Sequence, residues 1–140
     1  PKIHRYLGFF SETGLSDYLQ HDATVPELLI NPGVPNMVIL PAGKPISGST
    51  DMLGSPKMES LVKEMKHRYP ERYVIFDCPP LLTVSDALVF SSYVDGVLLV
   101  VQAGGTSKRE IRKAMELLSE KNVIGLVMNG LKDKATPYYY

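Results

Sequence analysis

The chain has 140 residues, of which 44% are hydrophobic and 21% are charged, and this composition suits one globular domain that needs neither disulfides nor a metal to form its core. Its 15 basic residues balance 15 acidic ones, so charge gives no reason to expect nucleic acid or an anionic membrane as a partner. Cys78 has no second cysteine with which to pair, no signal segment opens the sequence, and the apolar runs are too short to cross a bilayer. Together these features predict a cytoplasmic protein without a membrane span.

Capping signals and apolar stripes predict four helices. Thr24 begins a Thr-x-x-Glu capping box that opens a short helix through Leu29. Ser55 is the expected N-cap of a longer helix with one apolar stripe. A third helix is expected over 87–93, and Ser107 begins a second capping box ahead of a fourth helix, which also has an apolar stripe. The two stripes are Met58, Leu61, Val62 and Met65, and Ile111, Ala114, Met115 and Leu118.

Four short apolar runs, rich in β-branched residues, predict strands. Their hydrophobicity is continuous rather than alternating, which indicates strands covered on both faces, as in a parallel sheet. Because the runs alternate with helices, the sequence predicts a mainly parallel α/β sheet with right-handed crossovers. Ligands of such sheets bind at the carboxyl ends of the strands, so a site is expected in the loops that follow the runs. The runs are 37–40, 73–76, 97–101 and 123–128.

The segment Val-Ile-Phe-Asp-Cys-Pro-Pro at 74–80 is the strongest functional motif. Three apolar residues followed by Asp77 place a carboxylate at the end of a buried strand, where it can order the water shell of a Mg²⁺ ion beside nucleotide phosphates. The two prolines force an abrupt exit from the strand. From the apolar run and aspartate alone, Asp77 is explained equally well as a turn residue or a helix N-cap.

The segment Gly-Lys-Pro-Ile-Ser-Gly-Ser-Thr at 43–50 is similar to the phosphate-binding loop G-x-x-x-x-G-K-[ST]. Ser49 stands where that template has its lysine, and Pro45 removes an amide donor from the anion-binding turn. The next helix is expected to begin only after Ser55, too far along the chain to point its positive end at the loop. The segment is therefore interpreted as a decoy, although Lys44 falls where deviant phosphate loops carry an extra lysine.

The motif at 74–80 opens a stretch that resembles the bacterial protein-tyrosine kinases of exopolysaccharide synthesis. The matching sequence is VIFDCPPLLTVSDALVFSSYVDGVLLVVQAGGTSKREIRKAMELL, followed by IGLVMNGLK. The likeness extends upstream through PKIHRYLG, GLSDYL, VILPAG and LGSPKMESLVKEM, so it covers the whole chain. These kinases are deviant phosphate-loop ATPases, alongside the Min and Par proteins, and the segment 67–82 is most similar to the subgroup associated with exosortase-type export. The resemblance implies a three-layer α/β/α fold whose mainly parallel sheet is an incomplete form of the P-loop NTPase sheet.

The resemblance also implies roles for individual residues. Asp77 matches the Walker B aspartate, which acts on Mg²⁺ through water, and Asn129 matches an asparagine that reads the adenine edge of ATP. Tyr138, Tyr139 and Tyr140 resemble the family's C-terminal tyrosine cluster, which is phosphorylated between neighbouring subunits. Apart from the family, Asn129 is better explained as a strand-end turn residue, and the alternative for the tyrosines is an ordinary frayed tail.

The family's phosphate loop and first aspartate-rich motif match no part of the 140 residues, and both are expected to lie before Pro1. Residues 1–136 are therefore expected to form the C-terminal portion of a kinase domain, and 137–140 a tyrosine-rich tail. Because phosphoryl transfer depends on positioned lysine, backbone amides and metal, the chain by itself is expected to be inactive.

The predicted function is part of an ATP-dependent tyrosine autokinase that regulates exopolysaccharide or capsule synthesis or export, with MgATP as the phosphoryl donor to tyrosines of an adjacent subunit. Further copies of the chain and a membrane chain-length regulator are the expected partners, and the regulator would hold the protein at the inner membrane. Two alternatives stay open: a Par- or Min-like ATPase switch, and a non-catalytic binding module or phosphorylation target. The tyrosine tail favours the kinase, since such a switch has no use for it.

Overall fold

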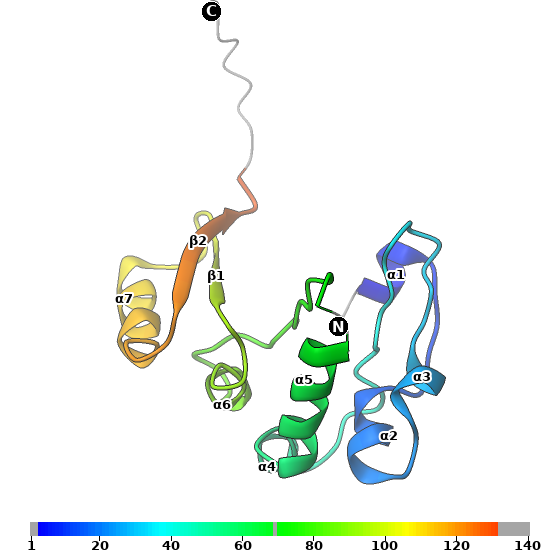
Figure 1. Cartoon of the computed structure of the whole chain (residues 1–140). Helices are drawn as coiled ribbons and strands as arrows, with labels where there is room; N and C mark the ends of the chain where they lie inside the picture. The colour runs from blue at the N-terminus through cyan, green and yellow to red at the C-terminus, as the bar shows by residue number, and fades with distance from the viewer. Residues whose placement is uncertain (1–2, 69, 132–140) are drawn as a thin grey trace, which may run out of the picture. The chain divides into compact units, whose positions relative to one another are not determined.

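The computed structural model describes residues 3–68 and 70–131 of the chain. The chain divides into two compact units, Pro1–Leu61 and Val62–Tyr140. The long helix α5, Pro56–Arg68, begins in the first unit and ends in the second (Figure 1).

The first unit consists of short helices and one antiparallel bridge. Ile30 and Ile39 exchange two backbone hydrogen bonds, of 2.8 and 2.9 Å. Its buried apolar side chains are Leu28, Met58 and Leu61, so its core depends on α3 and on the first turns of α5. The helices that precede α5 are α1 Ile3–Leu7, α2 Leu15–Gln20, α3 Val25–Leu28 and α4 Ser49–Leu53.

The loop that contains Gly43 packs tightly against the start of α2. The Leu15 N–H donates a hydrogen bond of 2.8 Å to the carbonyl of Pro41. Gly43 has a φ of 77°, and a Cβ atom at this position would lie 2.1 Å from the Ser16 hydroxyl oxygen. Only glycine fits both the backbone conformation and the space at position 43.

Replacing Gly43 with alanine is expected to lower the free energy of unfolding by about 3 kcal/mol, because the cost of positive φ adds to a steric clash. Gly33→Ala is the matched control, since Gly33 has a φ of 79° but no heavy atom within 4 Å of its would-be Cβ. That variant is expected to lose only the backbone part, about 1 kcal/mol. Urea unfolding measures both values, and equal losses would contradict the packing described for the Gly43 loop.

The second unit contains a parallel β-α-β crossover. Strands β1 Val97–Gln102 and β2 Val123–Asn129 pair in parallel, and α7 Lys108–Leu117 connects them. Figure 1 shows α7 beside the strands, and Ala114 on its apolar stripe is buried. The α/β class with a parallel sheet, predicted from the sequence, is confirmed.

Both predicted capping boxes are present. The Ser107 N–H donates to a carboxylate oxygen of Glu110 at 2.8 Å, and the Glu110 N–H donates to the Ser107 hydroxyl at 3.2 Å. The side-chain and backbone hydrogen bonds with Ser107 lower the pKa of Glu110. At α3, the Thr24 N–H donates to Glu27 at 2.9 Å, and this backbone hydrogen bond is the main cause of the lowered pKa of Glu27. The stabilisation of both helix starts by hydrogen bonds to a charged carboxylate is lost as the pH falls and Glu27 and Glu110 become protonated.

The third predicted helix is shorter than expected. Helix α6 runs over Asp86–Phe90, and a turn follows it where the sequence predicts helix through residue 93. Phe90, at the end of α6, contacts the rings of Phe76 and Tyr93, with ring centroids 4.6 and 5.8 Å apart. These aromatic contacts fix the segment that precedes Asp77 to α6.

Two of the four predicted strands are wrong for the described residues. The run 37–40 contributes only the Ile39 bridge, and 73–76 has no paired neighbour within residues 3–68 and 70–131. Tyr73 and Ile75 are 98% and 89% exposed. An apolar run forms a strand only where another backbone accepts and donates its hydrogen bonds, and these two runs lack such a ladder.

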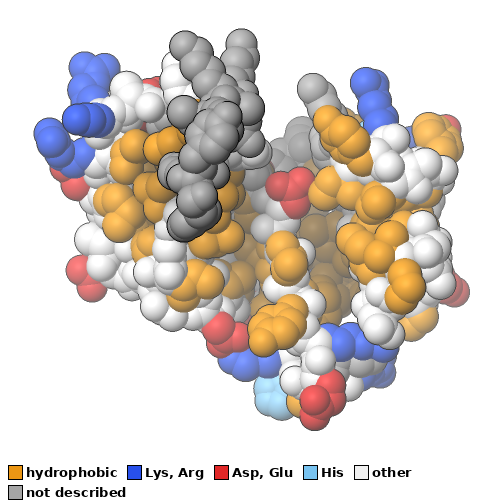
Figure 2. All heavy atoms as spheres, turned by 90° about the horizontal axis from the view of Figure 1, so that it is seen from above, with side chains coloured by type: hydrophobic (Ala, Val, Ile, Leu, Met, Phe, Trp, Pro, Cys, Tyr) orange, Lys and Arg blue, Asp and Glu red, His pale blue; other side chains and the backbone are white. Residues whose placement is uncertain are grey.

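Both faces of the β1–β2 sheet carry exposed apolar side chains, among them Leu98 on one face and Met128 on the other, so the prediction of cover on both faces is also wrong for the described residues. Val101 is buried, whereas Leu98 and Val100 are 52% and 57% exposed. Val127, the register partner of Val100, is exposed on the same face. Figure 2, a view onto the carboxyl ends of the strands, shows hydrophobic side chains open to the surface of this unit.

Candidate functional site

The carboxyl ends of β1 and β2 bring Gln102 and Asn129 side by side. These two residues are register partners, and the Ala103 N–H donates to the Asn129 carbonyl at 2.8 Å. Both side chains are exposed. Asn129 therefore lies at the sheet edge where parallel α/β proteins bind ligands.

Only the oxygen of the Asn129 side-chain amide has a hydrogen bond within the described residues. This oxygen accepts a hydrogen bond of 2.8 Å from the Gly130 N–H, and Gly130 has a φ of 72°. In the part of the chain that the structure describes, the NH₂ group of Asn129 donates to no other residue. Its two donors are thus available to a polar ligand, such as the edge of a base.

The loop after β1 forms a closed turn at the same edge. The Gln102 N–H donates to the Thr106 hydroxyl at 3.0 Å, and the Thr106 N–H donates to the Gln102 carbonyl at 2.9 Å. Gly104, with a φ of 69°, allows this reversal. The sequence predicts a site in this loop because the loop follows a strand, but it does not predict the Gln102–Thr106 hydrogen bonds. The Gly-Gly-Thr run at 104–106 is the sequence feature that could have indicated this turn.

Asp77 lies in the exposed loop that follows Phe76. The Phe76 ring is half-buried against Phe90, which anchors the segment immediately before the carboxylate. Within residues 3–68 and 70–131, no hydrogen bond or ion pair engages the Asp77 side chain, and none joins it to Asn129. Its carboxylate is free to accept hydrogen bonds from a hydrated cation.

Asp86 lies near this loop, a proximity that the sequence did not reveal. Desolvation of the Cys78 thiol, followed by the negative charges of Asp77 and Asp86, raises the pKa of Cys78. The sequence predicts Asp86 as a first-turn carboxylate of its helix and leaves a role near the active site open, and Asp86 is the first residue of α6. The structure therefore gathers two carboxylates around one thiol.

The Cys78 thiol is expected to react with iodoacetamide at higher pH than an ordinary cysteine, because its raised pKa keeps it protonated. Asp86→Asn removes one of the charges that disfavour the thiolate, so it should lower the pKa and move the pH–rate curve to lower pH. The alkylation rate measured between pH 7 and about 10 gives this midpoint. An unchanged midpoint in Asp86→Asn, with Asp22→Asn as the control, would place Asp86 away from the thiol.

The donor set around Asp77 fits a metal that is held mainly by water and phosphate. Among the described residues, no group of three or more His, Cys, Asp or Glu side chains is placed to hold a metal ion. Mg²⁺ keeps several waters and is usually bound through one or two carboxylates together with substrate phosphates. The single carboxylate of Asp77 is therefore sufficient for a Mg²⁺ ion that is held mainly by water and phosphate.

The segment 43–50 differs from the prediction at its end. The sequence places the next helix after Ser55, but α4 already begins at Ser49, because Gly48 adopts a φ of 72° at its N-cap. This helix is only five residues long. Lys44 Nζ lies 3.3 Å from a carboxylate oxygen of Glu12, and both side chains are largely exposed.

The remaining predicted site residues, Tyr138, Tyr139 and Tyr140, lie outside the described residues. Among the helices that are described, none combines the length and the apolar character needed to cross a bilayer.

Comparison with known proteins identifies the relatives of the chain. No protein-family model matches it. It is 29% identical over 143 residues to the tyrosine-protein kinase YwqD of Bacillus subtilis, a match that covers 100% of the chain and 60% of YwqD. It spans between 54% and 62% of the length of the first curated relatives that it matches.

Solved structures agree with the sequence comparison. The kinase domain of the Escherichia coli tyrosine kinase ETK matches with a TM-score of 0.86 and 27% identity, over 99% of this chain and 55% of that one. The chimerical protein CapA2B2 matches with a TM-score of 0.86 and 26% identity, over 95% of this chain and 59% of that one. The homologues of the chain are thus bacterial tyrosine-protein kinases, and its α/β fold is the P-loop-like fold of their kinase domains.

Proposed function

We propose that the chain is the C-terminal portion, 1–136, of an ATP-dependent protein-tyrosine autokinase domain, followed by an acceptor tail at 137–140. The observation that carries this proposal is the match of nearly the whole chain to tyrosine kinase domains. Asp77 and Asn129 support it, since Asp77 lies in the loop after a strand-like run, Asn129 ends strand β2, and both keep polar atoms for a ligand. The parent process would be the control of exopolysaccharide or capsule synthesis.

In the proposed reaction, the γ-phosphoryl group of ATP passes to a tyrosine oxygen, ADP departs as the leaving group, and the hydroxyl proton is released to solvent. A Mg²⁺ ion bound with the nucleotide would supply positive charge beside the phosphates. Asp77 would hold the hydrated ion through its carboxylate, which has no hydrogen bond or ion pair with the described residues. Asn129 orients the adenine through its amide, and Tyr138, Tyr139 and Tyr140 of an adjacent subunit accept the phosphoryl group.

The proposed domain needs further polypeptide to complete its sheet and its phosphate site. The 140 residues contain no G-x-x-x-x-G-K-[ST] segment, and Lys44 already pairs with Glu12. The exposed Leu98 and Val100, and the unpaired run at 73–76, offer an apolar face and a backbone edge for additional strands. The 140 residues by themselves are therefore proposed to be inactive.

Two forms of the protein test this function. The 140-residue chain incubated with MgATP is expected to form no phosphotyrosine. A form extended by the preceding part of its reading frame, if that part carries a glycine-rich loop with lysine, is expected to phosphorylate its tail. Absence of phosphotyrosine from such an extended form, with MgATP binding intact, would favour the ATPase switch; absence of nucleotide binding would favour the binding module.

The proposed partners follow from phosphorylation between subunits and from the polysaccharide role. Self-association would bring one subunit's tail to another's site, and a membrane chain-length regulator would hold the protein at the cytoplasmic side of the inner membrane. Sedimentation of the extended form with and without the regulator's cytoplasmic segment tests both contacts.

A further inference from the structure

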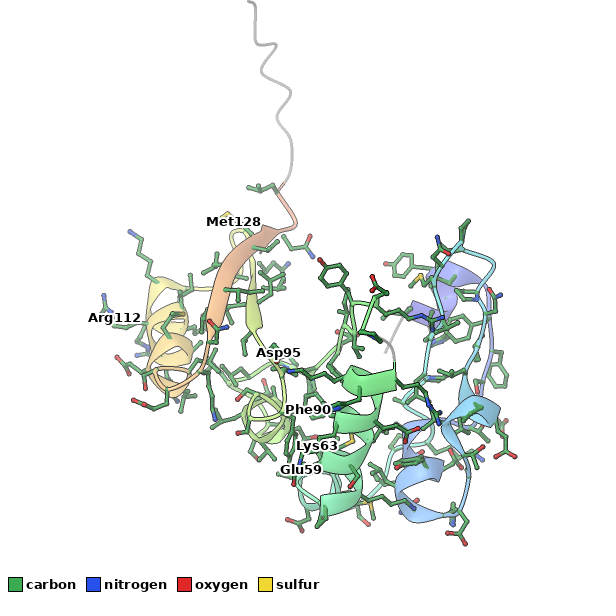
Figure 3. All side chains as sticks on the ribbon, viewed as in Figure 1. Glu59, Lys63, Phe90, Asp95, Arg112 and Met128 are labelled. Atoms are coloured by element: carbon green, nitrogen blue, oxygen red, sulfur yellow. The ribbon has the colours of Figure 1, made fainter. Side chains whose placement is uncertain are left out.

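Helix α7 carries a group of basic side chains on the side opposite its buried stripe. Arg109, Arg112 and Lys113 are exposed, and together with Glu116 they line one surface hollow, here called the basic hollow. Residues three and four positions apart lie on the same side of a helix, about one turn from each other. Figure 3 shows Arg112 pointing outward from α7.

The basic hollow has an excess of positive charge, because three basic side chains and one carboxylate, Glu116, line it. No ion pair engages Arg109, Arg112 or Lys113 within residues 3–68 and 70–131. The nearby Glu110 carboxylate accepts the Ser107 N–H of the capping box and interacts electrostatically with Arg109, and Glu116 is the acidic member of the hollow itself. Two guanidinium groups and an ammonium on one helix face suit a phosphate group, because each guanidinium can pair with two of its oxygens.

The segment 132–140, which ends in the tyrosine tail, follows β2 and starts from the same edge of this unit. Strand β1 ends at Gln102 and α7 begins at Lys108, so the first turns of α7 lie at the carboxyl edge of the sheet, where β2 also ends (Figure 1). The nine residues 132–140 follow. Fully extended, they reach about 30 Å. This length exceeds the diameter of a helix, about 10–12 Å, so the tail can reach the outer side of α7 in its own chain.

Phosphorylation would reverse the charge of the segment 132–140. Its side chains include Lys132, Asp133 and Lys134, which leave a net charge of +1 and give it no attraction to the basic hollow. Each phosphotyrosine adds about −1.5 to −2 at neutral pH. The phosphorylated tail, with three tyrosines modified, is therefore complementary to the hollow, and the unmodified tail is not.

We propose that the phosphorylated tyrosine tail docks on the basic hollow of α7 in the same chain. This inference rests on the proposed tyrosine phosphorylation. Docking would hold the modified tail on its own subunit and shield its phosphate groups from a phosphatase. The basic hollow is then a phosphotyrosine-binding site that regulates the proposed autokinase.

The test uses the 140-residue chain made by semisynthesis with phosphotyrosine at positions 138, 139 and 140, so that no kinase activity is required. A general tyrosine phosphatase is expected to release phosphate about tenfold more slowly from this chain than from the variant Arg109→Gln/Arg112→Gln/Lys113→Gln, because tenfold protection corresponds to a docking constant of about 10. The Nε–Hε NMR signals of Arg109 and Arg112 are expected to shift on tail phosphorylation. Both effects should weaken in 0.5 M salt, which screens exposed charges.

Two matched variants separate docking from general charge. Lys108→Gln removes the same charge from the same helix but outside the hollow, so its dephosphorylation rate should stay within about twofold of the native rate. Arg112→Lys keeps the charge but loses the planar guanidinium that pairs with two phosphate oxygens, so the protection of the tail from the phosphatase should be intermediate. Circular dichroism checks that α7 remains folded in each variant.

Equal dephosphorylation rates in the native chain and the triple variant would overturn the proposal. Protection that rises with protein concentration would also overturn it, since the tail would then dock on a second copy. A kinase assay without phosphotyrosine would contradict the proposed function alone, because the semisynthetic tail tests the basic hollow independently.

Discussion

Replacing Asp77 with asparagine is expected to reduce tyrosine phosphorylation at least about 100-fold in an extended form of the protein that carries a phosphate-binding loop, because the amide cannot hold a hydrated Mg²⁺ by charge. The fold should be unaffected. Asp77 is exposed and has no hydrogen bond or ion pair with the residues that the structure describes, so its negative charge supports no packing. The initial rate of phosphotyrosine formation at saturating MgATP gives the effect on activity, and urea unfolding gives the effect on stability.

Asp22→Asn is the control for this measurement. Asp22 is also exposed and lies in the first unit, and the substitution Asp22→Asn removes the same charge from the chain. Its variant should phosphorylate tyrosine at the native rate. If Asp77→Asn is as active as Asp22→Asn, then Asp77 is a turn residue, and the proposed Mg²⁺ role is wrong.

The helices of this chain are predictable because their signals are local. Ser107 and Glu110 form their box within a few residues, and the spacing that places Ala114 on the apolar stripe does not depend on the rest of the fold. Helices α1, α2 and α4 are only five or six residues long, too short for an apolar stripe, and the sequence pattern does not predict them.

Strands depend on partners, and for this reason half of the strand predictions do not match the structure. The run 73–76 has a composition typical of a buried strand, yet Tyr73 and Ile75 lie exposed and unpaired in the described residues. The runs at β1 and β2 succeed because they pair with each other. The composition of a segment indicates that it can form a strand, but the strand forms only where a second backbone is placed to pair with it.

The same distinction applies to the candidate site. Asn129 could be placed at a strand end from the sequence, since it directly follows an apolar run that pairs with β1. The turn between Gln102 and Thr106 depends on hydrogen bonds within a glycine-rich loop, and the approach of Asp86 to Cys78 depends on how α6 packs. Neither feature has a spacing rule that would identify it in advance.

Replacing Tyr138, Tyr139 and Tyr140 together with phenylalanine is expected to remove at least about 90% of the phosphotyrosine formed by the extended protein, because hydroxyls on a tail can reach a neighbouring site whereas most tyrosines of a folded domain cannot. Tyr6 and Tyr73 are the stringent controls, since at 85% and 98% exposure they are also accessible acceptors. The double variant Tyr6→Phe/Tyr73→Phe should retain nearly all the phosphotyrosine, measured by mass spectrometry. Unchanged phosphotyrosine in the tail variant would count against the tail as acceptor and leave the ATPase switch as the better explanation.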